Sequence, residues 1–424
     1  MKTITDDLDL IGANGRKASR KLSKLSGSTK DRALIRVADE LKAREKEILS
    51  ANVLDYDAGR RKGLQDSSLD RLLLTTERLE TIAAGVRRIA AMPDPLAETF
   101  DARMLPNGLR AGKRRVPLGV IGAIYESRPN ITVDIATLCL KSGNAVILRG
   151  GREAFNSNYA LAGLIRDSVA AAGMPEDAVQ FVSSTDRSLV GKLLKMKDFI
   201  DLIIPRGGAE LVRRVASEAT MPAITGGVGV CHTYIDSRAD VEMAVAIVHN
   251  AKVSRPYVCN ALDTVLVHSK IAPTYLPRLA TEWAKADVEM HCDRRAISIL
   301  GQSKGLNVTS ATDEDWGKEF LSLTAAIKIV DSMDEALYHI TNYGSGHTEA
   351  IVTEDYSAAE RFLDEVDSGV VLVNASTRFN DGGQFGLGAE VAISTNKMHA
   401  RGPIGLKELT SYKWTVRGTG QVRD

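Results

Sequence analysis

From residue 119 onward, short apolar segments alternate with longer segments of helical length, and this alternation constrains the fold more than any other feature. In the first block we expect strands at 120–125, 145–149, 179–182 and 199–204, with helices at 131–141, 156–172 and 209–219. Helices of this length between strands permit right-handed crossovers, which place the strands parallel in one sheet. The pattern therefore predicts a nucleotide-binding α/β architecture.

A second block with the same alternation follows Asp240. Here we expect helices at 240–250, 274–285, 333–341 and 357–366, and strands at 262–267, 325–330, 348–353 and 370–374. Two α/β blocks of this size, in a chain of 424 residues, indicate two domains with a cleft between them.

The segments outside the two blocks have different patterns. Helical periodicity predicts helices at 28–49 and 78–91, with Gly63 as a breaker between them. A turn signal within 104–109 separates two extended runs and predicts a β-hairpin. The segment 411–417 alternates polar and apolar residues, and we expect this strand either to pair with the hairpin or to join the sheet of another subunit.

Charge and composition exclude several classes of protein. Lys and Arg total 55 against 54 acidic residues, and a net charge of +1 gives no support to a nucleic-acid or membrane partner. No apolar run reaches the roughly 18 residues of a spanning helix, and we see no secretory signal. The cysteines are Cys139, Cys231, Cys259 and Cys292. They form no CxxC pair, and the histidines and carboxylates show no metal spacing, so we expect a cytoplasmic enzyme without a metal ion.

Two turns after predicted strands are candidate phosphate sites. Gly207 and Gly208 precede a helix, where free backbone N–H groups at the positive end of the helix dipole can hold a phosphate. Arg149 and Arg152 flank the turn after the strand at 145–149 and can pair with a phosphate. A tight turn that needs glycine explains either segment equally well, and the dinucleotide fingerprint GxGxxG does not follow the first strand.

Glycines also cluster at 226–229 and 382–388. Each cluster alone is more often a turn than a site. Both lie at element boundaries, where a backbone must approach a ligand or a partner closely.

Cys259 is the candidate nucleophile. It lies at the junction of the two blocks, directly before the strand expected at 262–267. A thiolate is intrinsically nucleophilic, and a poised site lowers its pKa. Most cysteines are small buried hydrophobes, and Cys139, inside an apolar helix, fits that role. The residues alone thus predict a two-domain nucleotide-binding enzyme with a candidate cysteine nucleophile, and they leave its substrate open.

Six longer motifs resemble the aldehyde dehydrogenase superfamily over nearly the whole chain. They occupy 117–122, 125–130, 373–379, 385–390, 399–403 and 409–413. The resemblance implies two Rossmann-like α/β domains plus a small β oligomerisation element. The implied division is a cofactor-binding domain of 1–98 and 116–236, a catalytic domain of 237–375, an oligomerisation element of 99–115 and 400–424, and a return segment of 376–399.

The resemblance also implies a reaction. The matching branch of the superfamily uses NADPH to reduce L-glutamate 5-phosphate to L-glutamate 5-semialdehyde and phosphate, the second step of proline biosynthesis. The Cys259 thiolate would displace phosphate and form a thioester, which hydride then reduces. Relatives that make free acids carry a Glu two residues before a Gly-Gly pair, as the base for hydrolysis. Here Ile224-Thr225 precede Gly226-Gly227, so that base is missing and acyl-phosphate reduction is favoured.

Further site residues are implied by the same resemblance. For the cofactor they are Arg149, Arg152, Gly207, Gly208 and Glu319. Arg149 stands where the superfamily has a lysine near the adenosine ribose, and with Arg152 close by a 2′-phosphate could be paired, which favours NADPH over NADH. Glu319 matches the glutamate that holds the nicotinamide ribose.

For the oxyanion or the substrate, the implied residues are Arg128, Asn130, Arg255, Asn260, Asn374 and Arg378. Arg128 stands where hydrolytic relatives place an asparagine that donates to the oxyanion, and Asn130 follows two residues later. Arg128 can instead bind an anionic group of the substrate. Arg255 and Arg378 are expected partners for a carboxylate or phosphate.

Two alternatives and several partners complete the expectations. A related reductase would act on a different acyl phosphate or on an acyl-CoA, and a non-catalytic nucleotide-binding protein is disfavoured because the Cys259 motif is intact. We also expect a homo-oligomer, a dimer or tetramer, and an association with glutamate 5-kinase, which makes the labile acyl phosphate.

Overall fold

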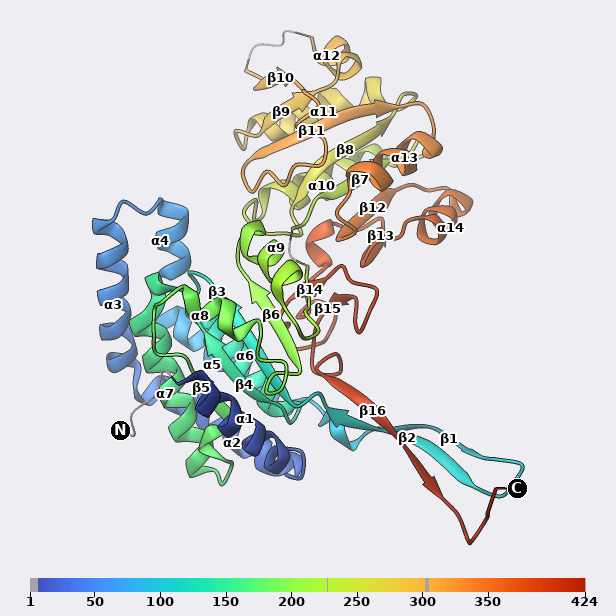
Figure 1. The fold of residues 1–424 in the computed structure, drawn as a ribbon. Coiled ribbons are helices and arrows are strands. Elements are labelled where there is room, and N and C mark those ends of the chain that lie inside the picture. Colours follow the sequence, from blue (N-terminus) through green and yellow to red (C-terminus); the bar gives the residue numbers. More distant parts are fainter. Residues whose placement is uncertain (1–6, 227, 302–304, 424) are drawn as a thin grey trace. The chain divides into compact units, whose positions relative to one another are not determined.

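The computed structural model describes residues 7–226, 228–301 and 305–423, and the chain divides into two compact units (Figure 1). The first unit extends to Thr225 and also contains Gly386–Ala392 and the residues from Pro403 onward. The second unit contains Gly226–Phe385 and Ile393–Gly402. Each unit has its own parallel sheet, so the predicted α/β fold class is confirmed.

The sheet of the first unit has the strand order β5-β4-β3-β6, and all neighbours are parallel. The strands are β3 (Val120–Tyr125), β4 (Ala145–Arg149), β5 (Val179–Phe181) and β6 (Leu202–Arg206). β6 begins later than the predicted 199–204, because the N–H groups of Phe199 and Ile200 close a turn on the Met196 carbonyl.

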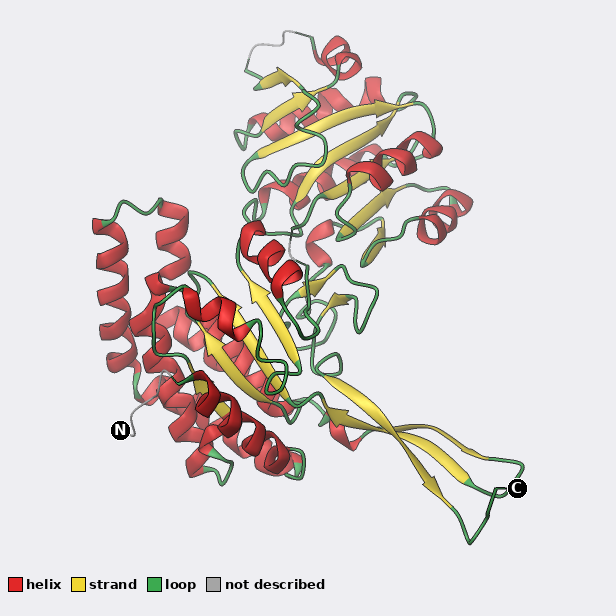
Figure 2. Cartoon of the chain, viewed as in Figure 1, coloured by secondary structure: helices red, strands yellow, loops and turns green. Residues whose placement is uncertain are grey.

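Helices cover both faces of this sheet (Figure 2). They are α1 (Leu8–Leu22), α2 (Gly27–Ala43), α3 (Glu45–Arg61), α4 (Asp66–Leu72), α5 (Thr76–Ala91), α6 (Asn130–Lys141), α7 (Phe155–Ala171), α8 (Ser188–Leu193) and α9 (Ala209–Glu218). Gly15 of α1 lies beside Val120 and Ile147 on one face. Side chains alternate between faces along a strand, and the Tyr125 hydroxyl meets Thr132 of α6 on the other face.

The helix predicted over 28–49 is in fact two helices that meet at Arg44. This residue leaves helical geometry, with φ −103° and ψ 21°, and ends α2 where α3 begins. Its guanidinium pairs with Glu47 of α3 and with Asp167 of α7. None of the described helices combines the length and apolar character needed to span a membrane.

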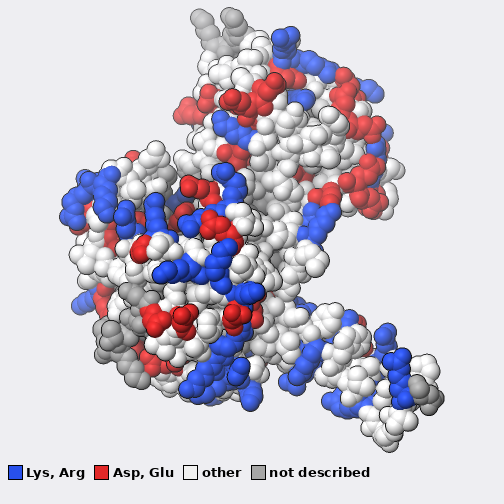
Figure 3. Space-filling model, in the orientation of Figure 1, with Lys and Arg blue, Asp and Glu red and all other residues white. Residues whose placement is uncertain are grey.

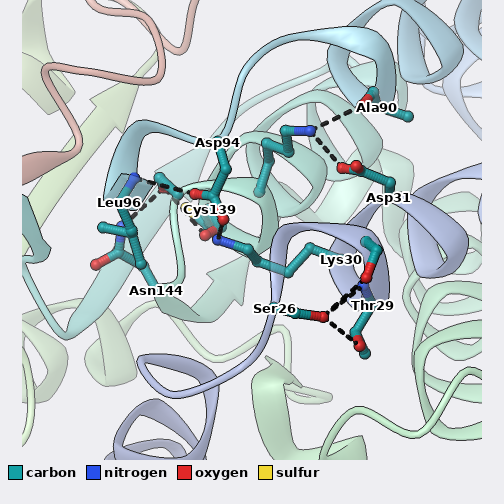
Figure 4. A network of polar contacts seen from close by, with 12 residues as sticks. Ser26, Thr29, Lys30, Asp31, Ala90, Asp94, Leu96, Cys139 and Asn144 are labelled. Carbon is teal, nitrogen blue, oxygen red and sulfur yellow. Dashed lines mark hydrogen bonds and ion pairs between the residues drawn. The ribbon is translucent and has the colours of Figure 1, made fainter. Parts of the chain in front are cut away.

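Two lysines without exposed surface tie the outer helices of the first unit together (Figure 4). The Lys30 ammonium of α2 lies 2.6 Å from the Asp94 carboxylate. The Lys141 ammonium of α6 pairs with Asp31 of α2 and donates to the Ala90 carbonyl of α5 at 2.8 Å. Burial lowers the pKa of Lys30, and the Asp94 partner opposes that shift. These contacts therefore join α2, α5 and α6 through two ammonium groups that have no exposed surface.

The sheet of the second unit is also parallel throughout, with the order β10-β9-β11-β8-β7-β12-β13. Its strands are β7 (Cys231–Ile235), β8 (Leu262–His268), β9 (Glu289–Cys292), β10 (Val308–Ser310), β11 (Thr324–Val330), β12 (Thr348–Val352) and β13 (Val370–Val373). Its helices are α10 (Val241–Val253), α11 (Ala272–Ala284), α12 (Arg294–Leu300), α13 (Met333–Tyr343) and α14 (Tyr356–Glu365). One core cluster joins the sheet to α10, α11 and α12 around Trp283, and another joins it to α13 and α14 around Phe362.

β7 places the boundary between the units earlier than the sequence interpretation did. The interpretation ended the cofactor domain at residue 236, whereas β7 pairs with β8 and β12 and belongs to the second sheet. The return segment 376–399 is likewise shared, since only 386–392 of it joins the first unit. A buried five-residue strand with no helix directly before it carries no sequence signal for which sheet it joins.

The predicted hairpin and terminal strand form a third, antiparallel sheet within the first unit. Its order is β1 (Thr99–Met104), β2 (Arg110–Pro117) and β16 (Thr410–Arg417). The first of the two expected pairings of the terminal strand is thus confirmed. The two-residue strands β14 (Ile393–Ser394) and β15 (Gly402–Pro403) also pair with each other.

Replacing Asp94 with alanine is expected to lower the free energy of unfolding by about 3 kcal/mol or more, because Lys30 is then left buried without its partner. Urea unfolding of Asp94→Ala and of the double variant Lys30→Met/Asp94→Ala measures this. The double variant removes both charges and should recover most of the loss. A single variant as stable as the wild type would show that the ion pair does not hold α2 in place.

Candidate active site

Cys259 lies in the loop between α10 and β8 and is half-buried. The loop turns tightly there, since the Ala261 N–H donates to the Val258 carbonyl at 3.0 Å. The other three cysteines are buried, and burial raises the pKa of each of their thiols. All four cysteines are in the described part of the chain, and Cys259 alone has a partly exposed side chain, as a nucleophile requires.

The segment that leads into β7 lies directly against the Cys259 backbone. A Cβ at Gly229 would overlap the Cys259 carbonyl, so this close approach requires glycine. The Cys231 thiol donates to the same carbonyl at 3.2 Å. The Gly229 N–H donates to the Glu319 carboxylate at 3.0 Å. Cys259 and Glu319, which are far apart in the sequence, are therefore held by the same three-residue segment.

The carboxyl group of Glu319 has a raised pKa. Burial raises its pKa to about 7, the Gly229 N–H opposes the shift, and the nearby Asp263 adds to it. The next residue, Phe320, donates its N–H to Asp263 at 3.0 Å, and Cys231 donates its N–H to the other oxygen at 3.3 Å. Asp263 thus aligns the Glu319 segment with β7.

Asn260 and Arg378, two of the residues that the sequence predicts for the oxyanion or the substrate, lie in contact with each other. The Arg378 guanidinium donates to the Asn260 side-chain oxygen, and the Asn260 amide donates to the Asn380 carbonyl at 2.9 Å. The Asn260 carbonyl accepts from the Thr377 hydroxyl at 2.8 Å. The 3-10 turn η4 (Thr377–Phe379) is therefore bound to the residue that follows the candidate nucleophile.

A cationic pair lies near Cys259. Arg378 is half-buried, and burial followed by the charge of Arg255 lowers its pKa, whereas Asp381 and, to a smaller extent, Cys259 act in the opposite direction. Arg255 is exposed. Two guanidinium groups close enough to influence each other, in the part of the second unit that holds Cys259, can bind an anionic group.

The contacts of the Asn374 side chain are with the backbone of Thr353 and not with Asn260 or Arg378. Its side chain accepts from the Thr353 N–H and donates to the Thr353 carbonyl, both at 2.9 Å. Its φ of 53° places it in the left-handed region, where asparagine is tolerated. The amide therefore joins the ends of β12 and β13.

The first unit has candidate anion-binding groups of its own. Gly207 and Gly208 are exposed at the start of α9, and the Gly208 N–H donates to the Glu126 carboxylate at 3.0 Å. A carboxylate therefore already occupies the position that the sequence predicts for a phosphate.

Arg149 is 7% exposed at the end of β4. Its guanidinium donates to the Gly150 carbonyl at 3.1 Å and, at 3.4 Å, to the carbonyls of Thr185 and Asp186. Burial lowers its pKa, and its buried Nε has no hydrogen-bond partner. A buried, incompletely paired guanidinium is a suitable site for an anionic ligand.

Arg152 begins the 3-10 turn η2 (Arg152–Ala154) and lines a cavity of about 550 Å³ within the first unit. Glu126, Ser127 and Thr185 line the same cavity. So do Asp55, Ala58, Gly59 and Lys62, in or just after α3. The sequence interpretation gave these helical residues no chemical role, since a helix that lines a cavity has the same periodicity as one that only packs.

Arg128 and Asn130 also lie in the first unit, and their expected role beside Cys259 stays a prediction. Arg128 is half-buried after β3. The Asn130 amide donates to Asp134 at 2.9 Å, and burial raises the pKa of that carboxyl to about 6. Within the described ranges, no group of three or more His, Cys, Asp and Glu side chains is placed to hold a metal ion.

Comparison with known proteins identifies the relatives of this chain. The model of the aldehyde dehydrogenase family matches residues 3–299. The gamma-glutamyl phosphate reductase of Dehalococcoides mccartyi strain CBDB1 is 58% identical over 408 residues, 96% of each chain. That of Roseiflexus castenholzii is 52% identical over 98% of this chain and 99% of the relative. The solved gamma-glutamyl phosphate reductase of Thermotoga maritima has a TM-score of 0.95 and 43% identity, covering 99% of this chain and 100% of that one.

Glu319→Gln is expected to gain stability relative to the wild type as the pH rises. The folded carboxyl keeps its proton up to about pH 7, whereas the unfolded chain releases it near pH 4.5. The contribution of Glu319 to the free energy of unfolding therefore falls across this range, and glutamine, which keeps an acceptor for Gly229, does not titrate.

Urea unfolding at pH 5 and pH 8 measures the free energy of unfolding of the variant and of the wild type. Between these pH values the difference should grow by about 1 kcal/mol in favour of the variant, a figure that allows for partial exposure of the carboxyl. Glu314→Gln, at an exposed position in the same loop, is the matched control for the loss of one carboxylate. A difference for Glu319→Gln that does not change with pH would contradict the burial argument.

Proposed function

Because the chain belongs to the aldehyde dehydrogenase family and matches gamma-glutamyl phosphate reductases over nearly its whole length, we propose that Cys259 carries the chemistry of that enzyme. The chain is an oxidoreductase that reduces L-glutamate 5-phosphate to L-glutamate 5-semialdehyde and phosphate, a step of proline biosynthesis. The observation that supports the role of Cys259 best is its partly exposed thiol, because the other three cysteines, all in the described part of the chain, are buried.

The Cys259 thiolate attacks the acyl carbon of the substrate, and the carbon–oxygen bond to phosphate breaks. Phosphate leaves with the electron pair, and a thioester remains on Cys259. When bound, a nicotinamide cofactor would supply the hydride for reduction of the thioester carbon. The carbon–sulfur bond then breaks, which releases the aldehyde and regenerates the thiolate. The Cys259 N–H is the first candidate donor to the oxyanion in each tetrahedral state.

Arg255 and Arg378 bind the anionic ends of the substrate. Their two charges next to the nucleophile match a molecule that carries a phosphate and a carboxylate. The Asn260 side chain takes no separate part, because it fixes Arg378 and the η4 turn in place. Ile224 and Thr225 stand where acid-forming relatives have a general base, so water is not activated against the thioester.

The cofactor is a nicotinamide nucleotide, and we assign it to NADPH. Arg149, with its unpaired Nε, and Arg152, on the cavity wall, would hold the 2′-phosphate. Gly207 and Gly208 would hold the pyrophosphate after Glu126 has moved away from the α9 terminus. Glu319 would accept from the nicotinamide ribose in its ionised form.

The third sheet supports a homo-oligomer. Tyr412 and Trp414 of β16 are 48% and 49% exposed, and the Lys113 ammonium lies 4.6 Å and 5.0 Å from their ring centres. Figure 3 shows mainly basic and uncharged residues on this sheet. Such an aromatic and cationic face fits the surface of another subunit. Dimer or tetramer formation, an association with glutamate 5-kinase and a cytoplasmic location stay predictions.

The reverse reaction tests the function of Cys259. NADPH formation from glutamate 5-semialdehyde and NADP⁺ should require phosphate, and it should fall at least about 10³-fold in Cys259→Ala. Cys292→Ala, which removes a buried thiol of the same unit, is the control and should keep its activity. Turnover without phosphate would mean a hydrolytic dehydrogenase, and turnover with coenzyme A in place of phosphate would favour the acyl-CoA alternative.

Cofactor titrations test the assignment of Arg152. Arg152→Ala should weaken NADPH binding about tenfold and leave NADH binding within about twofold, because only NADPH has the 2′-phosphate. Glu126→Gln, in contrast, should strengthen both cofactors, since each must displace that carboxylate from α9. Equal loss of NADPH and NADH binding in Arg152→Ala would place this arginine elsewhere on the cofactor.

A further inference from the structure

We propose that Cys231 is a positioning residue for the nucleophile, acting through the hydrogen bond from its buried thiol to the Cys259 carbonyl. The inference rests on the proposed role of Cys259. The donor sulfur lies 3.2 Å from the carbonyl oxygen, and the two residues come from different segments of the second unit. This contact fixes the peptide group that directly follows the reactive side chain.

Cys231 is itself held rigidly. It begins β7, which lies between β8 and β12, and its N–H donates to Asp263 at 3.3 Å. Its sulfur lies 3.8 Å from His347 Nδ1. Burial raises the pKa of the thiol well above its ordinary value, so the proton that makes the hydrogen bond stays on the sulfur. Cys231 thus acts as a fixed neutral donor and not as a second nucleophile.

The residue after Cys259 is held by contacts of its own. The Asn260 carbonyl accepts from Thr377, and the Asn260 amide donates to the Asn380 carbonyl. The Asn380 amide in turn donates to the Thr348 hydroxyl at 2.7 Å, and that hydroxyl lies 2.6 Å from His347 Nδ1. Contacts therefore lead from Cys231 around to Asn260, and two successive carbonyls are fixed, one by β7 and the other by the η4 turn.

Fixing these carbonyls matters for the chemistry. The Cys259 carbonyl carbon is bonded directly to the Cys259 Cα, so a displacement of this peptide group also displaces the Cα and the reactive side chain attached to it. A displacement of about 1 Å in a reacting group can cost a large factor in rate. The Glu319 contact is made by Gly229 and does not use the Cys231 thiol. Loss of that thiol is therefore expected to lower kcat while KM for the cofactor stays unchanged.

The test compares donor and non-donor side chains at residue 231. Cys231→Val fills the space of the thiol but has no hydrogen-bond donor. Cys231→Ala removes both the donor and the side-chain volume beyond Cβ, and Cys231→Ser restores a donor. Cys292→Val is the matched control for a buried thiol in the same unit. For each protein we would measure kcat, KM for the cofactor, and the pH profile of Cys259 alkylation by iodoacetamide without ligands, with the alkylated residue identified by peptide mass spectrometry.

We expect kcat to fall about three- to tenfold in Cys231→Val and Cys231→Ala, the range for one lost neutral hydrogen bond, with a changed alkylation profile. Cys231→Ser should lie within about twofold of the wild type, and Cys292→Val should match it. The proposal would be overturned if Cys231→Val or Cys231→Ala folds and has the kcat and the alkylation profile of the wild type. It would also be overturned if the kcat of Cys231→Ser is no higher than that of Cys231→Val. Alkylation needs no substrate, so it decides the role of Cys231 even if the reverse reaction shows that the proposed function is wrong.

Discussion

The close approach of Gly229 to the Cys259 carbonyl is the constraint around which the site of the second unit is arranged. Because only glycine lets the two backbones come so near, the segment before β7 can offer an N–H to Glu319 and a thiol to Cys259 within three residues. Asp263 then keeps β7 and the Glu319 segment in register by accepting an N–H from each. A nucleophile placed by the backbone in this way is ordered before any ligand binds.

In the first unit, Glu126 and Arg149 have opposite effects on the binding of an anion. Glu126 already satisfies the N-terminus of α9, so an incoming phosphate exchanges one anion for another at the positive end of the helix dipole. Arg149 differs, since it is buried with one nitrogen unpaired and gains a partner when a ligand arrives. Glu126 thus lowers the affinity for an anion and Arg149 raises it, and both lie at the carboxyl ends of neighbouring strands of one parallel sheet.

The sequence predicted the parts of this molecule that depend on local patterns. Continuous apolar runs such as 120–125 identified the central strands, and the turn within 104–109 identified the hairpin. The short strands β9 and β10 were missed because three or four residues show too little periodicity. The motif around Cys259 predicts a nucleophile, whereas Cys231 has no distinctive neighbours, and the role that we propose for it rests on a contact with a carbonyl 28 residues later in the chain. Glycines at 226–229 did signal a close approach, but only the fold shows which backbone they approach.

The pairing of β2 with β16 has a consequence for how the protein is made. The whole second unit is synthesised between these two strands, so β2 leaves the ribosome long before its partner does. The second unit can complete its own sheet during that interval, whereas the first unit waits with the hairpin edge unpaired. An unpaired strand edge is a template for wrong association. Strand pairing across such a large sequence separation makes the first unit the slower to mature, and its hairpin the segment most in need of protection on the nascent chain.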